Sequence, residues 1–291
     1  MIDVTLSFEG GLADNHSIDL YDAARALLGF QRSLALTTHL VLHGDIITQA
    51  PALQGAKIIT TAPEEGSWKV TAAIIATLWT AGTASKDTPF GHLLFSPYDY
   101  TVKETMGFHV DYDKSLGEQY DDYLREKKIT KEKVDSLIEK TEGAISDIHR
   151  PIVGNETAHS AKMVGYIDKA SPVAIGPDFS RATYEYIAHT VKSDNTTEVI
   201  GFISSYNSNT FKGRIFCFAE KRPIPFELDE KTRKRKDVNL ITSNLRYNAV
   251  QKSVALNNGD LSGAVKLTCF RMESSTGRLK ALAVNGVEKL Q

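Results

Sequence analysis

The chain has 291 residues, of which 42% are hydrophobic and 24% are charged, and its formal net charge is −2. This composition is typical of a globular protein with enough apolar material for a core, and it excludes a disordered or fibrous chain. One uncharged run, Val70 to Ser85, has 16 residues including four Thr, whereas a membrane-spanning helix needs about 20 apolar ones. We therefore expect a buried core segment and no membrane span, with association to a surface as the alternative. No signal peptide is evident at the N-terminus, so the expected location is cytoplasmic.

The first elements predict an α+β pattern. Residues 3–8 alternate apolar and polar side chains, as a strand does, and Gly10-Gly11 follows as a turn. A long helix is predicted from Ser17 or Asp19 to His43, with Gly44 at the C′ position. Its apolar positions at helical spacing are Leu20, Ala24, Leu27 and Leu34.

A second strand is predicted at residues 57–62 and a turn at 63–67, and the residues from Trp68 onward are predicted as a strand or a helix. Residues 113–149 are charged and helical, and Thr130 is a plausible N-cap. The apolar face of that helix consists of Val134, Leu137, Ile138 and Ile145. Arg150-Pro151 should end it.

Charge divides the chain into an acidic and a basic part. Residues 1–159 hold 14 Lys and Arg against 23 Asp and Glu, a balance of −9, whereas residues 160–291 hold 20 against 13, a balance of +7. Several Pro and Gly residues between Ile152 and Ser180 mark the boundary. We predict an acidic α+β helical domain at 1–159 and a basic β-barrel-like domain at 160–291, and the basic domain implies an anionic partner.

The second domain is predicted as three strands, a helix and two strands. The strands cover residues 198–206, 210–218 and 224–228 before the helix, which begins at Asp237, and residues 264–272 and 278–284 after it. This is the element order of an OB-fold, a five-stranded barrel that commonly binds oligonucleotides. An SH3-like barrel or a two-layer α+β sandwich fits the same order.

Polar residues gather at the first turn. Glu9, Asp14 and His16 lie near the Gly10-Gly11 turn, with Asp19 and Asp22 after them. Such a set could hold a divalent metal or move protons in an enzyme. The favoured interpretation is a tight turn whose acids stabilise the positive end of the helix.

The histidines and cysteines predict no metal site. His39 and His43 share one helix face, but Leu40 stands where the HExxH motif requires a Glu. Cys217 and Cys269 are too few for a metal cluster or a disulfide framework, and we expect both to be small buried hydrophobic residues. No cofactor is expected.

Basic residues are concentrated in the second domain, where five of the six residues from Lys231 to Lys236 are cations. The predicted contact residues are Lys212, Arg214, Lys221, Arg222, Lys231, Arg233, Lys234, Arg235 and Lys236, with the aromatic residues Tyr206 and Phe211. Cations interleaved with aromatics are typical of single-stranded nucleic-acid binding, in which each stacked base contributes ~1–3 kcal/mol. The alternative is a solvated loop with aromatics that pack in the core.

Short motifs resemble a widespread family of uncharacterised bacterial proteins with an EGGLAD-like turn and a Gly-Ser-aromatic motif. The matching segments are Phe8–Asp14, Tyr21–Gly29 and Pro63–Trp68, with weaker similarity at Arg150-Pro151, Gly213-Arg214 and Ile224–Leu228. The resemblance implies a bacterial, cytosolic protein of two parts from a defence or mobile-element system. It implies no activity.

These observations lead to a ranked set of functions. The first is a non-enzymatic binding or adaptor subunit, in which the basic barrel contacts nucleic acid or an acidic protein partner and the N-terminal half assembles into an oligomer or complex. The alternatives are a metal-dependent enzyme with its site near the Glu9–His16 turn, and a structural scaffold subunit of a complex.

Overall fold

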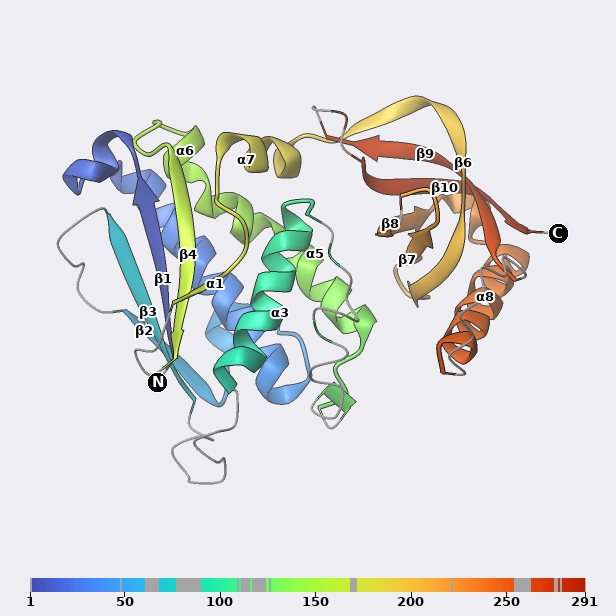
Figure 1. Cartoon of the computed structure of the whole chain (residues 1–291), viewed down its shortest axis with the longest axis horizontal. Helices are drawn as coiled ribbons and strands as arrows, with labels where there is room; N and C mark the ends of the chain where they lie inside the picture. Colours follow the sequence, from blue (N-terminus) through green and yellow to red (C-terminus); the bar gives the residue numbers. More distant parts are fainter. Residues whose placement is uncertain are drawn as a thin grey trace. The chain divides into compact units, whose positions relative to one another are not determined.

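The computed structural model describes residues 2–47, 49–60, 68–76, 90–108, 110, 116, 124–125, 127–167, 172–220, 222–253, 263–274, 277 and 279–290. The chain forms two compact units (Figure 1). The N-terminal unit comprises residues 1–108 and 112–188, and the C-terminal unit comprises residues 109–111 and 189–291. The class is α+β, as predicted.

The N-terminal unit combines helices with one antiparallel sheet. In chain order its elements are β1 (Ile2–Glu9), the 3-10 helix η1 (Gly11–Asn15), α1 (Leu20–His43), the 3-10 helix η2 (Ala50–Ala52), β2 (Ala56–Thr60), β3 (Lys69–Ala76), α3 (Phe90–Thr105), α5 (Lys131–Ile148), α6 (Arg150–Val153), β4 (Ser160–Ile167), β5 (Val173–Ala174) and α7 (Arg181–Ala188). The segment from Trp68 is therefore a strand as far as Ala76, and the rest of the uncharged run lies outside the described residues.

The sheet has the strand order β2-β3-β1-β4-β5, and β1 lies at its centre. Alternate side chains of β1, namely Ile2, Val4, Leu6 and Phe8, are buried in the core cluster of this unit. Because successive side chains of a strand point to opposite faces, these four all face the same side. Figure 1 shows α1, α3 and α5 beside one another over one face of the sheet.

The ends of α1 follow from local capping chemistry. The side chain of Asp19 accepts a hydrogen bond from the Asp22 backbone N–H, and Gly44 adopts a left-handed conformation with its N–H bonded to the Leu40 carbonyl. The predicted bounds are confirmed. The predicted apolar positions differ in burial, since Leu34 is fully buried whereas Leu20 is 84% exposed.

Helix α5 begins after Thr130, whose side chain accepts a hydrogen bond from the Lys133 backbone N–H, so the predicted N-cap is confirmed. Val134, Leu137 and Ile145 on its apolar face are buried. The predicted helical residues 113–130 lie largely outside the described residues. After His149 the short helix α6 begins, with Pro151 in its first turn.

The boundary between the units lies at residues 188/189, whereas the charge distribution predicts 159/160. The physical reason is β4, which pairs along its whole length with the central strand β1 and therefore belongs to the first sheet. The charge asymmetry is unaffected, because residues 189–291 hold 17 Lys and Arg against 10 Asp and Glu, a balance of +7.

The C-terminal unit contains five strands and a long helix. Its elements are β6 (Val191–Asn207), β7 (Lys212–Cys217), β8 (Arg222–Leu228), the 3-10 helix η4 (Glu230–Thr232), α8 (Arg235–Ser253), β9 (Val265–Glu273) and β10 (Leu279–Lys289). The predicted order of three strands, a helix and two strands is confirmed. The helix begins at Arg235, so Asp237 lies in its first turn and is not its N-cap.

The five strands form a closed ring in the order β10-β8-β7-β6-β9. All pairs are antiparallel except β8 with β10, which is parallel. Inside the ring lies an apolar cluster that includes Ile203, Ile215, Ile224 and Leu267. Helix α8 packs on β6, where Asn244 accepts from the Ile203 N–H at 2.6 Å and Asn248 donates to the Ile203 carbonyl at 2.9 Å.

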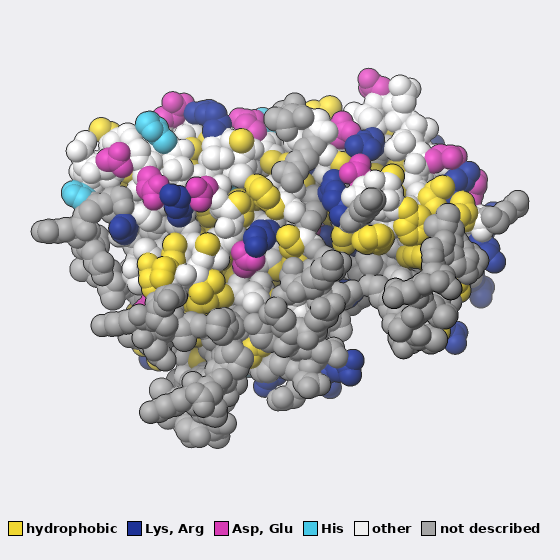
Figure 2. All heavy atoms as spheres, viewed as in Figure 1, with side chains coloured by type: hydrophobic (Ala, Val, Ile, Leu, Met, Phe, Trp, Pro, Cys, Tyr) yellow, Lys and Arg dark blue, Asp and Glu magenta, His cyan; other side chains and the backbone are white. Residues whose placement is uncertain are grey.

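Figure 2 shows Lys and Arg side chains beside Asp and Glu side chains on the face in view, with hydrophobic side chains between them. Among the described helices, none is long and apolar enough to cross a membrane.

Candidate functional site

The basic segment, residues 231–236, runs from η4 into the first turn of α8 and is anchored by uncharged groups. The Thr232 hydroxyl lies 2.8 Å from the Asp229 carbonyl and 2.9 Å from the Val284 carbonyl, and the side chain is buried. The Asp229 N–H also donates to the Val284 carbonyl, on β10. The segment is therefore fixed to the ring by Thr232 and the backbone.

Four cations of the basic segment are free. Lys231, Lys234, Arg235 and Lys236 are exposed, and none of their side chains forms an ion pair or a hydrogen bond within the part of the chain that the structure describes. Three acids, Asp229, Glu230 and Asp237, belong to the same stretch, and residues 229–237 keep a net charge of +2. Exposed charges of this kind cost nothing to leave unpaired in water and remain available to a ligand.

Arg233 differs from its neighbours because its side chain is held at three points. Its Nε donates to the Leu228 carbonyl at 2.9 Å, and its Nη2 lies 3.2 Å from the Glu227 carboxylate. Its guanidinium carbon lies over the Phe211 ring, 5.0 Å from the ring centroid, which is within cation–π range.

Phe211 lies in the turn between β6 and β7 and has a φ of 58°, which is rare for a bulky residue. Two backbone hydrogen bonds hold it there, from its own N–H to the Asn207 carbonyl at 2.9 Å and from the Leu228 N–H to its carbonyl at 3.0 Å. Its ring packs against the apolar cluster of the ring of strands. The structure thus brings Phe211 together with Arg233, which the sequence alone could not show.

Tyr206, the other predicted aromatic contact, belongs to the core. It is buried and stacks on Phe226 with ring centroids 6.4 Å apart. Burial raises the pKa of its hydroxyl, and the nearby Arg233 acts in the opposite direction. Tyr206 is therefore part of the core and is not available to stack on a ligand.

The remaining predicted cations lie elsewhere on the ring. Lys212 is half-buried and pairs across the strands with Glu227, and Arg214 is only 8% exposed. Arg222 lies 3.6 Å from Glu220, and its Nη2 lies 3.4 Å from the Leu279 carbonyl. Lys221 lies outside the described residues.

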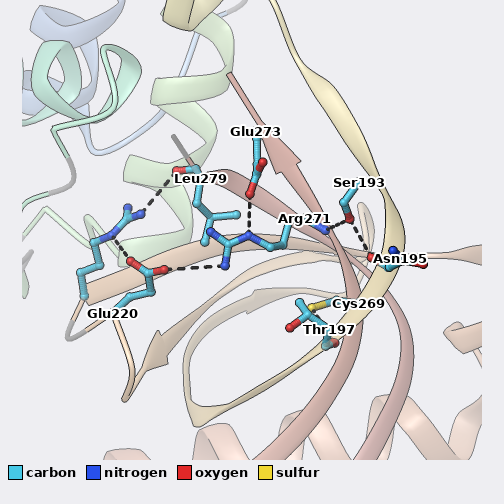
Figure 3. A network of polar contacts seen from close by, with 9 residues as sticks. Ser193, Asn195, Thr197, Glu220, Cys269, Arg271, Glu273 and Leu279 are labelled. Atoms are coloured by element: carbon cyan, nitrogen blue, oxygen red, sulfur yellow. Dashed lines mark hydrogen bonds and ion pairs between the residues drawn. The ribbon is translucent and has the colours of Figure 1, made fainter. Parts of the chain in front are cut away.

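Arg222 is part of a polar network with both signs of charge. Figure 3 shows Arg271 between Glu220 and Glu273, at 3.8 Å and 2.6 Å. Two arginines and two glutamates give this network no net charge, so it stabilises the fold and does not attract an anion. Sequence reasoning missed Glu220 and Glu227. Glu220 lies just before β8 and Glu227 lies on β8, and their closeness in the sequence to predicted contact cations was the signal that could have revealed them.

The polar residues of the first turn form separate local contacts. Glu9 lies 3.0 Å from Lys162 on β4, and the Asp14 carboxylate accepts from the Gly10 N–H at 2.8 Å. His16 is exposed at the end of η1 with a φ of 57°. Asp14 thus closes the turn and Glu9 forms an ion pair with a neighbouring strand, whereas the acid that caps the helix is Asp19.

The two helix histidines lie close together, with ring centroids 4.6 Å apart. Each also bonds to a backbone carbonyl, His39 to that of Asp45 and His43 to that of Gln54. Within the described ranges no three His, Cys, Asp or Glu residues are grouped in a way that could hold a metal ion.

Both cysteines are free and buried, as predicted. Burial raises the pKa of the Cys269 thiol to about 11, so it stays protonated at neutral pH and is a poor nucleophile.

Comparison with known families agrees with the two units. Residues 4–187 match the family described as Domain of unknown function (DUF7946). The chain therefore belongs to the DUF7946 family. Residues 195–288 match a second description, Family of unknown function (DUF7947), so the two matched segments lie on either side of the division between the units. Neither the curated proteins nor the solved structures gave a match.

Proposed function

We propose that the chain is a non-enzymatic nucleic-acid-binding subunit, and that its C-terminal unit makes the contact through the basic segment. The observation that carries the proposal is a set of four exposed cations whose side chains have no ion-pair partner among the described residues, namely Lys231, Lys234, Arg235 and Lys236. Phosphate groups supply the matching charge, and their neutralisation with release of counterions dominates the affinity of such contacts.

The topology of the ring supports this proposal. The C-terminal unit is a closed five-stranded ring with a helix between the third and fourth strands and a parallel pair of third and fifth strands, and we interpret it as an OB-like barrel. OB-fold proteins bind oligonucleotides on the face of the second and third strands and on the loop between the first and second. Phe211 lies in that loop, and Arg233 of the basic segment covers it.

The charge of the C-terminal unit supports it further. The balance of +7 over residues 189–291 raises the local concentration of a polyanion around the unit. This long-range term adds to the contacts of the basic segment and should be weakened by salt.

The test is binding of fluorescently labelled single-stranded DNA, single-stranded RNA and duplex DNA at about 50 mM and about 200 mM salt. We expect affinity to fall steeply with salt. Each phosphate contact on a single strand contributes about 0.7 to the slope of log affinity against log salt, so K234A/R235A/K236A should lose about 2 units of slope.

A matched control is R32A/K57A/K69A, which removes the same charge from the N-terminal unit and should change the slope little. No binding by the unmodified protein at low salt, or an unchanged slope in K234A/R235A/K236A, would overturn the proposal. In that case an acidic protein partner becomes the ligand to test.

A further inference from the structure

The Arg233 side chain differs from the other cations of the basic segment in what it offers a ligand. Its charge is already offset by Glu227 at 3.2 Å, and its Nε is already bonded to the Leu228 carbonyl. A phosphate would have to compete with both groups, so Arg233 is a weaker phosphate contact than Lys234 or Arg235.

The same contacts fix the guanidinium plane. Three points determine its orientation, namely the Leu228 carbonyl, the Glu227 carboxylate and the Phe211 ring beneath it. Phe211 is itself fixed by two backbone hydrogen bonds and by packing against the core. A planar group held in this way loses little conformational entropy when something stacks on it.

The side chain of Arg233 is one-third exposed, so part of it is open to solvent although it contacts Phe211 and Glu227. Guanidinium planes are surfaces on which unpaired bases of nucleic acids stack. Bases in a duplex are stacked on one another and cannot use such a surface without being pulled out of the helix.

From this geometry we infer that Arg233 on Phe211 is a stacking platform for one unpaired base, and that the ligand of the C-terminal unit is single-stranded nucleic acid. The inference rests on the proposed function and deepens it. Lys231 on one side of Arg233 and Lys234 and Arg235 on the other hold the phosphates, while Arg233 holds a base.

The experiment compares two probes that carry the same number of phosphates, a thymine homopolymer and an abasic oligodeoxynucleotide of the same length. One stacked base contributes ~1–3 kcal/mol, so the unmodified protein should bind the thymine homopolymer about 5-fold to about 150-fold more tightly. R233K keeps the charge and removes the plane, so it should bind both probes within about 2-fold of each other.

Salt dependence separates the two kinds of contact. R233K should keep the salt slope of the unmodified protein, whereas K234A/R235A/K236A should lose slope and keep the preference for bases. R246K makes the same substitution at an exposed position of α8 and should change neither quantity.

A second readout is the emission of 2-aminopurine placed in the single strand, which is quenched when the base stacks. We expect quenching with the unmodified protein and none with R233K. F211N, which tolerates the positive φ, should also abolish it while thermal unfolding reports that the barrel is folded.

Equal affinity for the two probes, or an undiminished base preference in R233K, would overturn the stacking platform and leave the proposed function standing. Failure of both probes to bind at low salt would overturn the single-stranded DNA ligand, and failure of single-stranded RNA and duplex DNA as well would overturn the proposed function itself.

Discussion

The carboxylate of Asp22 is fully buried and is paired with Arg150, whose Nη2 lies 3.0 Å from Oδ1 and whose Nε lies 3.2 Å from the same oxygen. The other oxygen, Oδ2, accepts from the Asn155 N–H at 2.8 Å. This pair joins the first turn of α1 to α6 and the loop after it. Asp22, which the sequence placed among the polar residues near the first turn, therefore has a structural role, because it connects distant segments of the chain.

Replacing Asp22 with Asn should destabilise the N-terminal unit by ~2 kcal/mol, because it removes charge-assisted hydrogen bonds of a buried carboxylate, while Arg150, 34% exposed, keeps part of its hydration. Urea unfolding followed by circular dichroism measures the loss. The control is R25A, which breaks the Arg25–Asp147 pair, where the side chains are 45% and 26% exposed. That pair should contribute ~1 kcal/mol or less. Equal losses in D22N and R25A would contradict the assigned role of Asp22.

Two glycines give a matched test of helix packing. A Cβ on Gly29 of α1 would collide with the Ala144 backbone carbonyl of α5, whereas a Cβ on Gly143 of α5 would meet nothing within 4 Å. We expect G29A to destabilise by about 1–3 kcal/mol through forced separation of the helices. G143A should stabilise by about 0.5–1 kcal/mol, since Ala favours a helix over Gly. Thermal unfolding of both variants measures the difference in sign, and a stabilised G29A would show that α1 and α5 are not tightly packed there.

Local rules were enough to predict much of the fold. Asp19, Gly44 and Thr130 act on backbone groups within four residues of themselves, so helix ends could be predicted without knowing the tertiary structure. Pairing between distant strands is a different matter. The local sequence does not reveal that β4 pairs with β1. Because of this non-local pairing, the observed boundary between the units lies about thirty residues after the predicted one.

The candidate site also has features that the local sequence could predict and features that depend on distant residues. The exposure of Lys234 and Arg235 could be predicted from a run of like charges, which a core cannot contain. The difference between Arg233 and these neighbours could not, because it depends on Phe211 in another loop and on Glu227 across the turn. Tyr206 was predicted as a contact from its residue type, but the strand directs its side chain into the core.

His149 predicts how stability depends on pH. It is buried, with Nδ1 2.9 Å from the Ile145 carbonyl and Nε2 2.9 Å from the Thr183 hydroxyl. Burial lowers the pKa of His149 from 6.5 to about 4, so between these values the unfolded chain binds a proton that the folded chain does not. Stability should therefore fall as pH drops below 6.5 and stop falling from this cause below about 4, a loss of ~3 kcal/mol.

The measurement is urea unfolding at a series of pH values, with H149Q as the variant. Its stability should change less between pH 7 and pH 4 than that of the unmodified protein, because one titrating group is gone. The exposed His16 serves as the control, and H16Q should keep the original pH profile. A profile that is the same in H149Q would mean that His149 is not held neutral.

The last prediction separates stability from binding in the basic segment. Thr232 anchors this segment to β10 and to Asp229, whereas the side chains of Lys234, Arg235 and Lys236 form no ion pair or hydrogen bond in the described part of the chain. T232V keeps the shape of the side chain and removes its hydroxyl, so it should lower the stability of the C-terminal unit by ~1–2 kcal/mol. K234A/R235A/K236A should leave the free energy of unfolding within ~0.5 kcal/mol of the unmodified value, because exposed side chains without contacts contribute little to it.

Thermal unfolding and oligonucleotide binding, measured on the same samples, should then change independently. The triple variant should lose affinity at an unchanged Tm, and T232V should have a lower Tm while it keeps the salt slope. A triple variant that unfolds at a markedly lower temperature would show that the cations hold the segment in place, and its loss of binding would no longer count in favour of a phosphate contact.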